Sequence, residues 1–207
     1  MALTKSQIFT LIGDNLPDNN SGAITPAKLR EVVTQIADAP IYAAAGVKEV
    51  EVLRAASTVT QAPSAVDTPL QLSFGAAQGS ASDPVMINAA GLVTFNLAGN
   101  YAVRIKTQNG RTGATGTSIL LMRILFNGTQ YGSPAATKIT ATDSTVPTES
   151  RVVLNPTAGQ TFQVQIMRDS AGSNFGGVYP QTATVAAWGV APSALLVISR
   201  LEPVPSP

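Results

Sequence analysis

The chain has 207 residues, enough for one main domain and a small appendage, and its formal net charge is +1. Because no stretch concentrates Lys or Arg into a basic patch, we expect no nucleic-acid partner. The absence of both Cys and His excludes disulfides, zinc–thiolate sites, histidine-based catalytic triads and imidazole metal sites.

The amino-terminal residues 1–45 differ from the rest because their apolar residues recur with a helical period. Thr4 and Gln7 fit a capping box ahead of a short apolar face, which predicts a helix over residues 4–12. Residues 14–22 are dense in Asp and Asn, include a Pro, a Ser and a Gly, and predict a turn. The alternative for that segment, a calcium loop, lacks the ligand order of an EF-hand.

A second helix is predicted over residues 25–38, where Thr25 supplies an N-cap and Pro26 suits the first turn. Its apolar stripe consists of Leu29, Val32, Val33 and Ile36. Two short helices bury little area against each other, so this stripe needs an external surface. That surface can be the body of the protein, other copies of the chain or a partner. We interpret the stripe as a docking face for a partner, and the alternative is that it packs against copies of itself.

The segment from Ala43 to Ala65 is rich in small residues, and we interpret it as a connector although residues 47–53 alternate as a strand would. The predicted organisation is a helical docking segment over 1–45, a connector over 46–66, a β-sandwich over 67–202 and a tail over 203–207.

Beyond the connector, alternating or β-branched runs recur between Gly, Pro and Asn residues. They predict strands at Leu70–Phe74, Val85–Asn88, Leu92–Leu97, Tyr101–Thr107, Ser118–Asn127, Thr137–Ala141, Ser150–Leu154, Thr161–Arg168, Ala183–Trp188 and Ala194–Leu201. A hairpin turn is predicted at Asn88–Gly91. No long crossover helix separates the strands, so we expect a mainly β fold with antiparallel sheets.

Two resemblances sharpen this expectation. The segment Ile24–Ile36 resembles the short helical openings of tailed-bacteriophage virion proteins such as fibre, decoration and neck components. Three stretches, Val93–Tyr101, Leu154–Val164 and Ala194–Leu201, resemble strands of the tumour-necrosis-factor and complement globular-head jelly roll. The second resemblance implies a homotrimer about a three-fold axis. The lack of Cys and of a collagen-like stalk favours a viral member over a secreted one.

Aromatic residues outside regular strands are candidate contacts. Phe175 and Tyr179 lie in the Gly-rich loop 170–180, where they either bind a neighbour or cover the edge of the core. Trp188 lies among small residues of a predicted strand, so we interpret it as core or trimer-axis packing rather than a ligand contact.

Charged residues within the predicted strands suggest two kinds of surface. Arg104 and Lys106 alternate with apolar residues and predict a solvated outer face. Arg123 interrupts an apolar run, so it either forms a salt bridge between subunits or faces solvent on an edge strand. Residues 110–116 superficially resemble a phosphate loop, but they lack its Gly-Lys-Ser/Thr ending and predict a hairpin or surface loop.

The functional hypothesis is a virion protein, assembled in the host cytoplasm, that acts as a capsid decoration (cement) or head-fibre protein. It would form a homotrimer and dock on the major capsid protein or another virion protein through its amino-terminal stripe. The alternative is a fibre or neck module that recognises a host glycan or protein through Phe175 and Tyr179. We expect no enzyme activity, cofactor, metal or membrane partner, because the twelve acidic residues are scattered and no apolar run is long enough to span a membrane.

Overall fold

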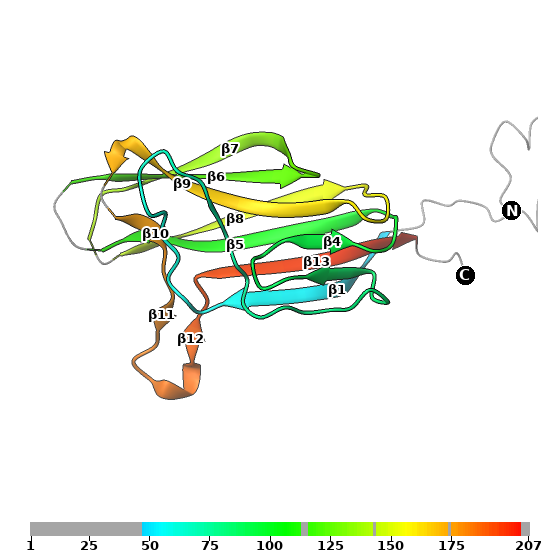
Figure 1. Cartoon of the computed structure of the whole chain (residues 1–207). Helices are drawn as coiled ribbons and strands as arrows, with labels where there is room; N and C mark the ends of the chain where they lie inside the picture. The colour runs from blue at the N-terminus through cyan, green and yellow to red at the C-terminus, as the bar shows by residue number, and fades with distance from the viewer. Residues whose placement is uncertain (1–46, 113–115, 143, 174, 204–207) are drawn as a thin grey trace, which may run out of the picture. The chain divides into compact units, whose positions relative to one another are not determined.

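The computed structural model describes residues 47–112, 116–142, 144–173 and 175–203 (Figure 1). Contacts divide the chain into two units, and the larger one, Glu49–Glu202, is the fold described below. The two helices predicted at 4–12 and 25–38 lie outside the described residues, and so does the stripe Leu29, Val32, Val33 and Ile36. Their structure and docking role stay predictions.

The described residues form thirteen strands and one short 3-10 helix. The strands are β1 (Val47–Ser57), β2 (Leu70–Gln71), β3 (Val85–Ile87), β4 (Val93–Phe95), β5 (Tyr101–Arg111), β6 (Ser118–Phe126), β7 (Thr129–Ile139), β8 (Thr145–Leu154), β9 (Thr161–Ser173), β10 (Gly176–Val178), β11 (Gln181–Thr182), β12 (Val190–Ala191) and β13 (Ala194–Pro203); the helix, η1, spans Ala186–Trp188.

The first sheet is built around β5, and its strands follow the order β1, β13, β5, β8. β8 pairs antiparallel with β5 from Tyr101, opposite Leu154, to Gly110, opposite Thr145. On its other side β5 pairs with β13 up to Thr107 and then with β10. Two different strands therefore share one edge of this long central strand.

The second sheet is built around β9, and its strands follow the order β3, β4, β9, β6, β7, with β2 also pairing with β9. Every pairing between its named strands is antiparallel. The two layers are visible in Figure 1, with β6, β7 and β9 in one and β5, β8 and β13 in the other.

The strand order identifies a jelly roll. Numbered along the chain, the eight long or central strands are β1, β4, β5, β6, β7, β8, β9 and β13. The first sheet then contains the first, eighth, third and sixth of them, and the second sheet contains the second, seventh, fourth and fifth. This interleaving is the two-Greek-key arrangement of a jelly roll, and it confirms the antiparallel sandwich expected from the sequence.

The core lies between the two sheets and is made of the inward-facing residues of both. Its largest fully buried side chains are Tyr101, Phe74, Phe95, Phe162, Leu72, Ile105, Leu120, Ile139, Ile166, Leu196 and Ile198. The Phe95 and Tyr101 rings are 5.0 Å apart, and the Tyr101 hydroxyl donates to the Leu97 carbonyl at 2.9 Å. The resembling stretch Val93–Tyr101 thus crosses from one sheet to the other while keeping two rings in the core.

Burial of Tyr101 makes the fold less stable at alkaline pH. Desolvation raises the pKa of the Tyr101 hydroxyl above its usual value, and the nearby charge of Arg200 offsets part of this rise. Because the folded state holds the proton more tightly, this contribution to stability is complete below the unfolded pKa of about 10 and is lost as the pH rises through the folded pKa.

We expect the urea midpoint of the wild-type protein to decrease when the pH is raised from 8 to 11. The urea midpoint of Tyr101→Phe should decrease less over the same interval. At pH 8 the variant should be less stable by about 1 kcal/mol, because the hydrogen bond to Leu97 is lost. Equal falls in the two proteins would show that Tyr101 does not cause the alkaline sensitivity.

Three expectations about the elements are wrong. β1 lies inside the segment predicted as a connector over 46–66, and its residues Leu53, Ala55 and Ser57 are buried beside β13. Residues 183–188 are not a strand, because they lie at the tip of the β11–β12 hairpin and end in η1. β7 starts well before the predicted 137, because a two-residue turn at Asn127 and Gly128, both with positive φ, joins it directly to β6.

The turn predicted at Asn88–Gly91 is confirmed. The Gly91 N–H donates to the Asn88 carbonyl at 2.9 Å, and β3 and β4 pair on either side. Gly91 has a φ of 85°, and a Cβ there would lie 1.8 Å from the Leu72 carbonyl oxygen. Only glycine therefore fits this turn against the β2 segment.

Candidate functional site

A short hairpin, β11–β12, extends beyond the two sheets (Figure 1). Gln181 pairs with Ala191 and Thr182 with Val190, and the tip between them contains η1. The sequence from Ser170 to Ser199 contains no charged residue. The hairpin is therefore an uncharged projection that neither of the two described sheets covers.

Trp188 is the most exposed large apolar residue of the described chain, with 84% of its surface accessible. Val185 is 60% exposed and Val190 is 43% exposed on the same hairpin. The core interpretation of Trp188 is wrong, because the strand predicted for it does not form and the hairpin leaves the sandwich. Its packing at a trimer axis stays a prediction. A tryptophan in an uncharged stretch was the available sequence signal for this surface.

The structure gives Phe175 and Tyr179 different positions. Phe175 is 55% exposed, so its ring is open to solvent. Its backbone has a positive φ of 44°. Tyr179 is half-buried, its hydroxyl donates to the Phe175 carbonyl at 2.6 Å, and its N–H donates to the Gln108 carbonyl at 2.9 Å. Tyr179 therefore ties the loop to β5, while Phe175 is the residue available for a contact.

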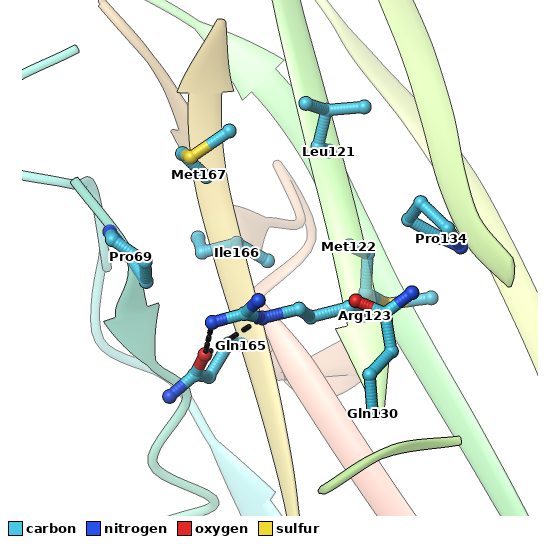
Figure 2. A pocket seen from close by; sticks show the side chains of 9 residues that line it. All are labelled: Pro69, Leu121, Met122, Arg123, Gln130, Pro134, Gln165, Ile166 and Met167. Carbon is cyan, nitrogen blue, oxygen red and sulfur yellow. Dashed lines mark hydrogen bonds between the residues drawn. The ribbon is translucent and has the colours of Figure 1, made fainter. Parts of the chain in front are cut away.

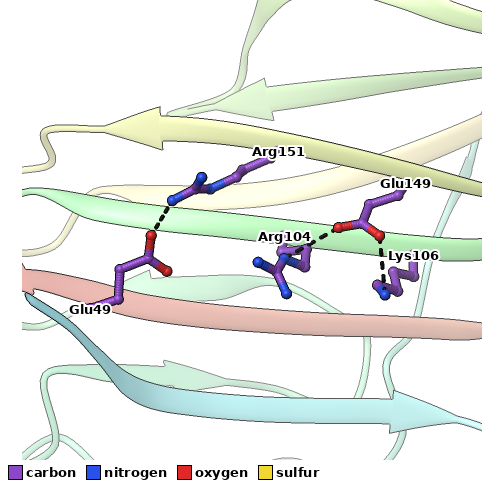
Figure 3. Close-up of polar contacts among 5 residues, drawn as sticks. All are labelled: Glu49, Arg104, Lys106, Glu149 and Arg151. Atoms are coloured by element: carbon purple, nitrogen blue, oxygen red, sulfur yellow. Dashed lines mark hydrogen bonds and ion pairs between the residues drawn. The ribbon is translucent and has the colours of Figure 1, made fainter.

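The outer face of the first sheet is a network of ion pairs (Figure 3). Glu149 on β8 lies 3.3 Å from Arg104 Nε and 3.0 Å from Lys106 Nζ, both on β5. Arg151 on β8 pairs with Glu49 on β1, across the two strands between them. The expected solvated face is confirmed. Such half-exposed pairs contribute about 0–1 kcal/mol each, so they shape the charge of this face more than its stability.

One further pair keeps the same face charged. Arg54 donates from Nε and Nη2 to the two carboxylate oxygens of Glu51, at 2.9 and 2.7 Å. This hydrogen bonding lowers the pKa of Glu51 and raises that of Arg54. Both side chains therefore stay ionised at neutral pH.

The outer face of the second sheet contains a groove around Arg123 (Figure 2). β6 lies between β9 and β7, so the prediction that Arg123 is on an edge strand is wrong. The Arg123 Nε and Nη2 atoms donate to Gln165 Oε1 at 2.9 and 2.7 Å. The salt bridge between subunits stays a prediction. Sequence reasoning missed this groove because Arg123 and Gln165 are 42 positions apart and no local pattern links them.

The segment that resembled a phosphate loop begins as a strand. β5 continues through Gly110 to Arg111, so the surface loop predicted over 110–116 starts only after Arg111. Arg111 is 3% exposed and its Nη2 donates to the Thr140 carbonyl at 2.8 Å. Residues 113–115 lie outside the described part of the chain.

Within the described residues, no group of three or more Asp or Glu side chains is placed to hold a metal ion. The same part of the chain has no helix long and apolar enough to cross a membrane. The turn predicted at residues 14–22, where a calcium loop was the alternative, is outside it.

Comparison with known proteins gives similarity of shape but no relative by sequence. No family model matches the chain, and no curated protein matches it. The globular domain of a zebrafish complement 1qA protein is similar over 75% of this chain and 99% of its own length, with 12% identity and a TM-score of 0.40. Murine APRIL is similar over 74% of this chain and all of its own length, with 13% identity and a TM-score of 0.44. The jelly-roll assignment rests on the strand order.

Proposed function

We propose that this chain is a non-enzymatic structural protein of a tailed-bacteriophage particle, a capsid decoration (cement) or head-fibre protein that associates as a homotrimer. The observation that carries the assembly role is the uncharged hairpin with Trp188 84% exposed. A large aromatic residue on an uncharged projection has the composition of an interface hot spot. The amino-terminal resemblance of Ile24–Ile36 supports the virion.

In this mechanism the jelly roll is a rigid frame, and the burial of apolar surface at the interfaces provides the free energy of association and docking. The hairpin packs on a neighbouring protomer, and the stripe Leu29, Val32, Val33 and Ile36 docks on the particle. Each apolar contact contributes roughly 25 cal/mol per Å² of buried area, less the cost of association.

Sedimentation equilibrium of the purified full chain tests the self-association. We expect a mass about three times the 21.3 kDa of the chain. A monomer at every concentration up to the solubility limit would contradict the homotrimer.

Docking is tested separately with the double variant Val33→Asp, Ile36→Asp. It should lose binding to purified particles, because two charges cannot be buried in an apolar interface without a large desolvation cost. Co-sedimentation with particles measures this, and the variant should keep the mass of the wild type. Unchanged co-sedimentation, or a variant that no longer folds, would argue against a docking role for this stripe.

A second candidate function is a fibre or neck module that recognises a host glycan or protein. Trp188 shares a shallow hollow with Gln181 and Thr182, which combines an aromatic surface with neutral hydrogen-bonding groups. Binding of the purified chain to a glycan array or to host cells, lost in both Trp188→Ala and Phe175→Ala, would favour this function. Loss of oligomeric mass in Trp188→Ala without any such binding would favour assembly.

A further inference from the structure

The groove on the outer face of the second sheet has a volume of about 160 Å³. Its walls are mostly apolar, and among the described residues Arg123 is the only charged one that lines it. The lining residues that matter here are Leu121, Met122, Arg123, Pro134, Gln165 and Met167. Ligand pockets for whole small molecules are usually about 300–1,000 Å³, so this groove is sized for one anchoring side chain.

An irregularity between β6 and β7 lies at the groove. Between two regular residue pairs of these strands, β6 has one residue, Arg123, whereas β7 has three, residues 132–134. Gly132 has a φ of 71°, and Pro134 has no N–H to donate to the ladder. Such bulges interrupt pairing and redirect side chains, and they are frequent beside binding sites.

The Arg123 guanidinium is oriented but not neutralised. Two of its N–H groups donate to a single neutral acceptor, Gln165 Oε1, which fixes the plane of the fork (Figure 2). The other three of the five N–H groups of an arginine have no acceptor among the described residues. No carboxylate from residues 47–112, 116–142, 144–173 or 175–203 lines the groove. A half-buried cation is therefore held in place with donors left for an incoming acceptor.

We propose that this groove binds a carboxylate of another protein, carried on a segment that has a large apolar side chain next to it. The arginine fork matches a carboxylate in geometry and charge, and Leu121, Met167 and Pro134 provide the apolar surface for the neighbouring side chain. A nucleic acid or a polyanion needs several cations, and the described part of the chain places one in the groove. Binding here does not depend on the self-association proposed above, because the groove and the hairpin share no residue.

Methionine methyl groups in and outside the groove can report ligand binding by NMR. Met122 and Met167 line the groove, whereas Met86 lies on β3 and does not. In the full chain labelled with ¹³C at the methionine methyl groups, N-acetyl-leucine should shift the resonances of Met122 and Met167 to saturation and leave Met86 in place. N-acetyl-leucinamide, which has the same side chain without the carboxylate, should bind about tenfold more weakly or worse.

Two groove variants and one control test whether the Arg123 guanidinium is responsible for the binding of N-acetyl-leucine. Arg123→Gln removes the charge, and Gln165→Glu places a permanent carboxylate against the same guanidinium; each should weaken N-acetyl-leucine binding about tenfold or more. Arg104→Gln, on the outer face of the other sheet, should change nothing. The Met86 resonance reports whether each variant keeps the fold. Equal shifts with both probes, unchanged binding in a folded Arg123→Gln or Gln165→Glu, or an equal loss in Arg104→Gln would overturn the site.

Discussion

Replacing Trp188 with alanine should leave the jelly roll folded and weaken association of the chain by about thirtyfold or more, the usual effect of removing an interface hot spot. The side chain is 84% exposed, so its loss removes almost no contact within one protomer. If it is buried between protomers, the same change removes the largest apolar side chain of the hairpin. Sedimentation velocity over a concentration series gives the association constant, and circular dichroism gives the fold.

The matched control is Leu97→Ala, which shortens another exposed apolar side chain, 43% accessible, away from the hairpin. It should leave the association constant of the chain unchanged. If Trp188→Ala associates as tightly as the wild type, the hairpin is not part of the interface between protomers, and contact with the particle or the host becomes the remaining role for it.

Replacing Phe162 with alanine should lower the free energy of unfolding by about 3–5 kcal/mol. Phe162 is fully buried on β9, where it lies opposite Val93 on β4 and Phe126 on β6. Its removal leaves a cavity at a point that connects three strands of the second sheet. Because a domain is typically stable by about 5–15 kcal/mol, this single change removes a large part of the total. Urea unfolding measures it.

Phe175→Ala provides the comparison, because it deletes the same ring at a position that is 55% exposed. Its effect on unfolding should stay within about 0.5 kcal/mol. If Phe162→Ala does not yield soluble protein, Ile166→Val, at another fully buried position of β9, should cost about 0.5–1.5 kcal/mol. Similar losses at the buried and the exposed phenylalanine would contradict the core described for this sandwich.

The surfaces proposed for binding differ in chemistry and in position. The hairpin around Trp188 is apolar and uncharged, the groove around Arg123 has one cation, and the outer face of the first sheet has paired charges of both signs. Raising the salt concentration should therefore affect carboxylate binding at Arg123 more than association through the hairpin. The described part of the chain thus offers separate surfaces that can be altered one at a time.

Local patterns in the sequence predicted what local geometry controls. The alternation around Arg104 and Lys106 placed both charges on one face of β5, because successive side chains of a strand point to opposite faces. Runs of β-branched residues between turn residues predicted the antiparallel sandwich, and Asn88–Gly91 predicted a hairpin turn. The same kind of pattern predicted helices at 4–12 and 25–38, which lie outside the described residues.

Pairing between segments that are distant in the sequence determined the features that local patterns did not predict. β1 has weak alternation, and two of its three buried residues, Ala55 and Ser57, are small, so only its place beside β13 makes it part of the sandwich. Trp188 has the sequence surroundings of a strand, yet it is exposed because β11 and β12 pair with each other away from the sheets. Arg123 and Gln165 meet because β6 and β9 are neighbours, and the extra residues of β7 leave the groove beside them. A sequence determines the period of a strand locally, but the exposure of a side chain depends on which strands the completed fold places around it.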